Sequence, residues 1–152
     1  MMTFAMLPAR LAVAVFAVGL TLALAGQPLR ADPPAHENWA VAGYDPVAYF
    51  TQGVPQPGLR AYALKWRGAI WLFATPESRA AFEADPAAYL PQFGGHCVVS
   101  VSDGHPAPGD PRLFVIRDGR LYLLGSAEAK ARLAAQPDVI ARAQAAWRQT
   151  GD

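Results

Sequence analysis

Two apolar runs joined by a two-residue turn constrain the fold more than any other feature of this sequence. The runs Ala61–Trp66 and Ala69–Ala74 are rich in aromatic and aliphatic side chains, and only Arg67 and Gly68 separate them. This pattern predicts a β-hairpin, because so short a connection returns the chain directly along its own path. Both faces of the hairpin carry apolar side chains, so we expect it to lie inside a sheet.

A second hairpin is predicted nearer the C-terminus. Its strands, Leu113–Ile116 and Arg120–Leu124, flank Arg117-Asp118-Gly119, in which Asp-Gly is a strong turn signal. The segment His96–Val101 follows a glycine loop and is predicted to be one further strand. The expected sheet therefore consists of two antiparallel hairpins and an additional strand.

Helix signals lie between and after these strands. Thr75 followed by a proline predicts a helix start, as does Ser126, and the two helices should end before Pro86 and near Ala135. Shorter helical turns or a last helix are expected to begin at three further positions: Asp45, Asp85 and Pro137. We therefore expect a small single α+β domain with three to four helices, and no internal repeat is evident.

The N-terminal segment has the form of a secretion signal. Arg10 precedes an uncharged apolar run from Leu11 to Ala25, which is shorter than the roughly 20 residues of a membrane span. Residues 1–31 are predicted to be a signal peptide cleaved after Ala25 or Ala31, with a retained anchor as the alternative. Residues 32–39 are then a linker and residues 40–150 the domain, in a bacterial periplasm or outside the cell.

Composition narrows the function further. The 152 residues carry 13 Lys and Arg against 12 Asp and Glu, so no basic excess is available to hold a phosphate backbone. We expect no nucleic-acid partner, and no stable membrane anchor once the signal is cleaved. The single cysteine excludes an intramolecular disulfide and any zinc site made of cysteines alone.

Three segments resemble a known family. GYDPVAYFTQG (Gly43–Gly53), the stretch Lys65–Cys97 and DPRLFVIRDGRLYL (Asp110–Leu123) are similar, in this order, to the exported YHS-domain proteins. The resemblance implies a small α+β module and covers most of residues 40–147. Metal-associated YHS domains carry a pair of cysteines, whereas this chain has Ala48 and Ala74-Thr75 at the corresponding places.

Cys97 is the first candidate for chemistry, because an unpaired exported cysteine is a liability unless it is buried or used. With His96 and His105 it could form a small ligand set. Copper(I) accepts such low coordination by thiolate and imidazole, whereas zinc would need a fourth group such as Asp103 or Asp110. The preferred function is a non-catalytic module that binds copper or a small ligand near Cys97.

Two alternatives stay open. Cys97 could be a buried, inert packing residue of a structural or protein-interaction module. It could also be the nucleophile of a thiol enzyme, activated by His105. A disulfide between two copies of Cys97 is a separate possibility.

A pocket beside the cysteine is expected from neighbouring segments. Gly94 and Gly95 allow close approach of the backbone, and Asp45 and Tyr49 could line the same space. Tyr44 belongs to the same segment. The structural alternative is that Asp45 caps a turn while the two tyrosines pack against the sheet.

Overall fold

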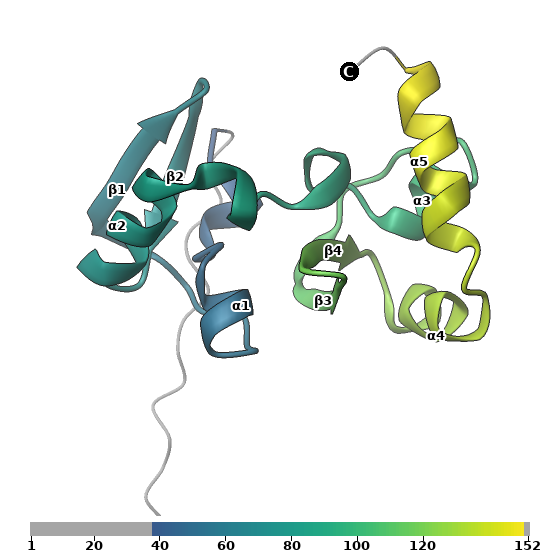
Figure 1. Ribbon diagram of the computed structural model, residues 1–152, viewed down its shortest axis with the longest axis horizontal. Helices are drawn as coiled ribbons and strands as arrows, with labels where there is room; N and C mark the ends of the chain where they lie inside the picture. Colours follow the sequence, from purple (N-terminus) through teal and green to yellow (C-terminus); the bar gives the residue numbers. More distant parts are fainter. Residues whose placement is uncertain (1–37, 151–152) are drawn as a thin grey trace, which may run out of the picture.

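The computed structural model describes residues 38–150 and confirms the α+β class. The predicted signal peptide and residues 32–37 of the predicted linker lie outside the described residues. The elements of Figure 1 follow in this order: η1 (Ala40–Gly43), α1 (Ala48–Thr51), β1 (Leu59–Trp66), β2 (Ala69–Phe73), α2 (Pro76–Ala84), η2 (Pro86–Tyr89), η3 (Gln92–Gly95), α3 (Val98–Ser102), β3 (Asp110–Arg117), β4 (Arg120–Leu124), α4 (Ala127–Ala135) and α5 (Val139–Gln149).

Both predicted hairpins form, β1 with β2 and β3 with β4. Each turns through two residues of positive φ, Arg67 (48°) and Gly68 (80°) in the first and Asp118 (50°) and Gly119 (67°) in the second. A turn with positive φ at both central residues has a backbone twist that matches the right-handed twist of the strands. The expectation of one continuous sheet is wrong, since the hairpins are two separate two-stranded sheets.

The helix caps are confirmed with one exception. The hydroxyls of Thr75 and Ser126 each accept a hydrogen bond, 3.1 Å long, from the amide three residues ahead. Asp45 caps the turn that leads into α1. The predicted cap at Asp85 is wrong, because its side chain makes no capping hydrogen bond to η2.

The predicted strand His96–Val101 is also wrong. His96 and Cys97 make only isolated bridges, to Pro108 and Leu123, and the chain then enters the short helix α3. Valine-rich sequence usually favours strands. Here, however, α3 packs between β4 and α5, where Val98 and Val101 are fully buried, so packing overrides the local preference.

An internal repeat, which the sequence did not reveal, organises the described residues into two halves. In the first half Asp45 N donates to Gln56 O at 2.8 Å, and in the second Cys97 N donates to Ala107 O at 2.8 Å. A left-handed turn precedes these residues in each half, and a short helix, a hairpin and a capped helix follow them in the same order. Figure 1 shows the halves side by side, with α5 added to the second.

Glycine occupies one matching position in both halves for the same steric reason. A Cβ on Gly58 would lie 2.4 Å from the Cβ of Leu72, and one on Gly109 would lie 2.5 Å from the Cβ of Leu123. Their amides make equivalent bonds, to Gly43 O (2.9 Å) and Gly95 O (3.0 Å) respectively. The repeat is therefore one of backbone geometry, retained at positions that admit no side chain.

Each half has its own core. The first is centred on Trp71, Phe73 and Phe82, and the second on α3, β4 and Leu133. A third, smaller cluster joins the halves, in which Tyr44 and Tyr49 pack against side chains of β4. Among the described residues, no helix combines the length and apolar character required to cross a membrane.

Candidate functional site

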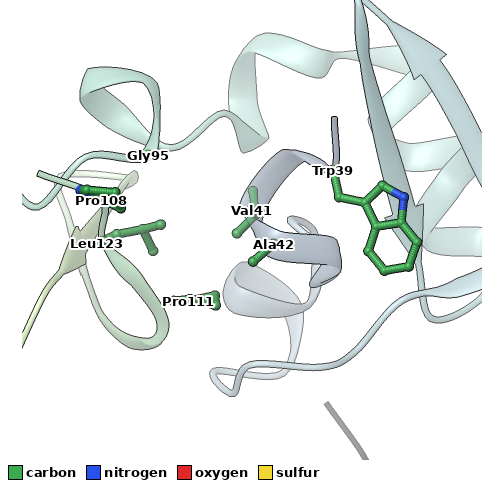
Figure 2. A pocket seen from close by; sticks show the side chains of 8 residues that line it. Trp39, Val41, Ala42, Gly95, Pro108, Pro111 and Leu123 are labelled. Atoms are coloured by element: carbon green, nitrogen blue, oxygen red, sulfur yellow. The ribbon is translucent and has the colours of Figure 1, made fainter. Parts of the chain in front are cut away.

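A pocket of about 240 Å³ lies where the two halves meet. The first half contributes Trp39, Val41 and Ala42, from η1 and the residue before it. The second half lines it with apolar side chains and glycines. Two of these residues are near Cys97: Gly95 lies two positions before it in the sequence, and Leu123 forms a β-bridge with it. In Figure 2 Val41 and Ala42 of the first half face Pro108, Pro111 and Leu123 of the second, while the Trp39 ring lies on the far side of the η1 turn. The site therefore exists only because the halves are joined.

The turn that carries Val41 and Ala42 has an unfavourable backbone. Val41 has φ 50° and ψ 35°, and Ala42 has φ 50° and ψ 28°. This left-handed region disfavours non-glycine residues, and a β-branched valine there is a clear outlier. The second half repeats the turn at Phe93 and Gly94, where one of the two residues is glycine. The first half thus keeps two side chains in a strained turn, and both line the pocket.

Tyr49 ties the halves together beside the pocket. Its hydroxyl donates to Pro111 O at 2.7 Å, and its ring meets Phe114 edge-on with centroids 4.8 Å apart. Burial raises the pKa of the Tyr49 phenol above its usual value, with smaller contributions from Tyr44 and nearby carboxylates. The phenol therefore stays protonated and acts as a structural donor. The two tyrosines pack against β4, as the structural alternative predicted.

Asp45 is buried and fully engaged. Its Oδ1 accepts from Val47 N (2.9 Å) and Ala48 N (3.4 Å), while its Oδ2 accepts from Ala74 N at 2.8 Å. The side chain therefore closes the α1 turn onto the end of β2. Neither Asp45 nor Tyr49 lines the pocket, so these residues support the site rather than form its wall.

Cys97 lies directly behind the pocket. Only 3% of the residue is exposed, and its backbone bridges Leu123, which lines the pocket. Its Sγ lies 3.7 Å from the position that a Cβ on Gly125 would occupy. The thiol thus occupies a packed position, as the inert alternative expects.

Neither candidate histidine is placed to share a ligand with the Cys97 thiol. The Nδ1 of His96 lies 2.8 Å from Phe93 O, and its ring packs on Trp147 with centroids 5.6 Å apart. His105 is exposed in the loop after α3. Within residues 38–150, no group of three or more His, Cys, Asp or Glu side chains is placed to hold a metal ion. The structure therefore does not assemble the ligand set expected from Cys97, His96 and His105.

The pocket offers apolar contact rather than proton transfer. Across the part of the chain described, no titratable side chain is among its lining residues. Of the residues predicted to form a pocket, Gly95 lines it, whereas Tyr44 and Gly94 do not. The sequence-based prediction did not include Trp39, Val41 and Ala42 in the pocket, because nothing in Ala-Val-Ala-Gly indicates a left-handed turn.

The fold and pocket together describe a duplicated α+β module with a small apolar site between its halves. The chain matches no family model, no curated protein and no solved structure.

Proposed function

We propose that this chain is an exported, non-catalytic binding module, similar to YHS domains, that holds a small apolar ligand between its two halves. The strained Val41-Ala42 turn carries the proposal, because strain of this kind persists where it serves a site. The apolar lining supports a ligand recognised by shape, and a volume of about 240 Å³ suits one of single-ring size.

The test uses indole and p-cresol as probes, followed by the amide chemical shifts of the protein. Ala42→Leu places a larger side chain in the pocket, whereas Ala61→Leu adds the same volume at an exposed position on β1 outside the pocket. Binding that shifts residues around Gly95 and Leu123, and that only Ala42→Leu weakens, supports the proposal. Shifts that map elsewhere, or that survive Ala42→Leu, overturn it.

Copper(I) binding at Cys97 is the alternative that the sequence favoured. It is tested by anaerobic titration of residues 32–152 beside Cys97→Ser, in competition with a chelating indicator. One tightly bound equivalent that Cys97→Ser loses would replace the apolar-ligand proposal with a metal-handling one. Absence of binding in both proteins removes copper from consideration and leaves Cys97 a packing residue.

An interaction module with an inert Cys97 makes a further prediction. A thiol buried to this extent should react with a thiol reagent at least about a hundredfold more slowly in the native protein than in denaturant, because reaction requires local opening. The same protein should migrate identically on reducing and non-reducing gels. Fast native reaction would return Cys97 to the candidates for thiol chemistry.

A further inference from the structure

A second pocket, of about 360 Å³, lies on the second half, apart from the one between the halves. Side chains from η3, from the start of β4 and from the C-terminal turns of α5 line it. They are Gln92, Phe93, Arg120, Gln144, Trp147 and Arg148.

The charged side chains that line this second pocket are all positive. Arg120 and Arg148 contribute two guanidinium groups, and Gln92 and Gln144 contribute amides, with no carboxylate among the lining residues of the described chain. Guanidinium groups and amides present donors that suit an oxyanion. The pocket is therefore built to attract negative charge.

These two arginines differ from most others in residues 38–150. Four arginines pair with carboxylates, and two stack on tryptophan rings: Arg79, Arg112, Arg132 and Arg142, then Arg60 and Arg67. Within the same residues, Arg120 and Arg148 have neither kind of partner, and nor does Arg117, which lies outside the pocket. Two of the three arginines without a partner thus meet in one place.

The apolar part of the pocket is held in a defined orientation. The rings of Phe93 and Trp147 meet edge-on, with centroids 5.8 Å apart. His96 packs on Trp147 and is itself held by its contact with Phe93 O. A half-buried indole beside two cations offers a surface on which a flat ring can stack.

The corresponding place in the first half lacks these features. There a pocket formed by residues 38–40 and 67–69 has Ala69 where the second half has Arg120, and its own Arg67 stacks on Trp66 at 4.5 Å. The helix α5, which supplies Trp147 and Arg148, has no counterpart in the first half. The cationic pocket is therefore a specialisation of the second half and not a by-product of the repeated backbone.

We propose that this second pocket binds a small aromatic carboxylate, with its carboxylate between Arg120 and Arg148 and its ring on Trp147. The two guanidinium groups and two amides account for the anionic end, and the indole accounts for the flat apolar end. This site is independent of the apolar pocket between the halves.

The test titrates the full-length protein with 2-naphthoate and, separately, with the neutral 2-naphthamide, and follows the indole N–H signal of Trp147. Arg120→Gln and Arg148→Gln should each weaken naphthoate binding about tenfold, the usual effect of losing one charge-assisted hydrogen bond. Arg117→Gln is the matched control, because it removes the same charge from a residue paired with Arg120 across the hairpin but outside the pocket. Naphthamide should bind at least tenfold more weakly than naphthoate.

Three outcomes overturn the proposal. Equal binding of naphthoate and naphthamide would show that charge is not recognised. An effect of Arg117→Gln as large as that of Arg120→Gln would show a diffuse field and not a site. Loss of naphthoate binding in Ala42→Leu would place the ligand in the pocket between the halves, whereas unchanged binding in that variant keeps the two sites distinct.

Discussion

Where the first half of the molecule buries a carboxylate, the second half buries a thiol. Asp45 accepts three backbone hydrogen bonds and ties α1 to the end of β2. Cys97 stands at the matching place, where Gly125 corresponds to Ala74 and the side chain packs among apolar neighbours. The same backbone geometry thus accommodates a polar side chain at Asp45 and an apolar one at Cys97. The fold itself therefore does not require chemistry from Cys97.

The largest expected effect tests this contrast directly. Asp45→Ala leaves three backbone donors without their acceptor and should lower the free energy of unfolding by about 4 kcal/mol. Cys97→Ala removes one buried sulfur and should cost about 1–2 kcal/mol. Chemical denaturation of both variants gives the two values. Equal losses in the free energy of unfolding would mean that the two side chains stabilise their halves equally and would contradict this contrast.

The matching glycines should respond alike. Gly58→Ala and Gly109→Ala each force a Cβ to within 2.4 or 2.5 Å of a leucine Cβ, so each should cost about 3 kcal/mol through overpacking. Gly53→Ala is the control, because the space around it is open and only its positive φ is strained, at about 1 kcal/mol. Melting temperatures rank the three variants, and a mild effect at only one of the matched glycines would argue against an equivalent role.

Tyr49, which belongs to the junction rather than to either half, should matter less. Tyr49→Phe loses the bond to Pro111 O and should cost about 1 kcal/mol at neutral pH. Because burial raises the pKa of the native phenol, the unfolded state loses its proton first above pH about 10. The parent protein should therefore lose stability as pH rises from there, at up to about 1.4 kcal/mol per pH unit. The variant should lack this component, and parallel alkaline profiles would contradict it.

The smallest effect is expected at an ion pair of the second half. Arg132 binds both carboxylate oxygens of Asp103 at 2.7 Å, and this hydrogen bonding lowers the pKa of Asp103. A lowered native pKa adds stability above the usual value near 3.8, and that stability disappears as pH falls through the native value. Asp103→Asn should be slightly less stable than the parent at neutral pH and equal to it in acid. A difference that persists in strong acid would point to packing instead.

Local signals predicted most of the elements. The two hairpins and the helices after Thr75 and Ser126 depend on turn and capping residues within a few positions, so the sequence alone was sufficient. The prediction of a strand over His96–Val101 is wrong, because the helical form of Val98–Ser102 depends on packing against α5. Asp45 was correctly expected to cap a turn, although its third bond, to Ala74, depends on the tertiary structure.

The candidate site was harder to predict. Its walls come from η1 and, far away in sequence, from η3, the residues before β3 and the β3–β4 hairpin. The turn at Val41 also uses residues that normally avoid such a conformation. The repeat was also hidden, because the halves agree mainly at glycines and turns while key positions such as Asp45 and Cys97 differ in chemistry. Backbone equivalence of this kind becomes visible only when hydrogen bonds can be compared.

Two separate cores also set the order in which this chain can fold. The contacts of the first core lie between Ala40 and Leu90, whereas those of the second begin only at Phe93. Each core therefore closes over a short stretch of chain, which favours rapid and independent collapse. The junction around Tyr49 forms last, since it needs β4 in place. During synthesis from the N-terminus, the first half can therefore fold before the second half has been made. The pocket between the halves then forms last.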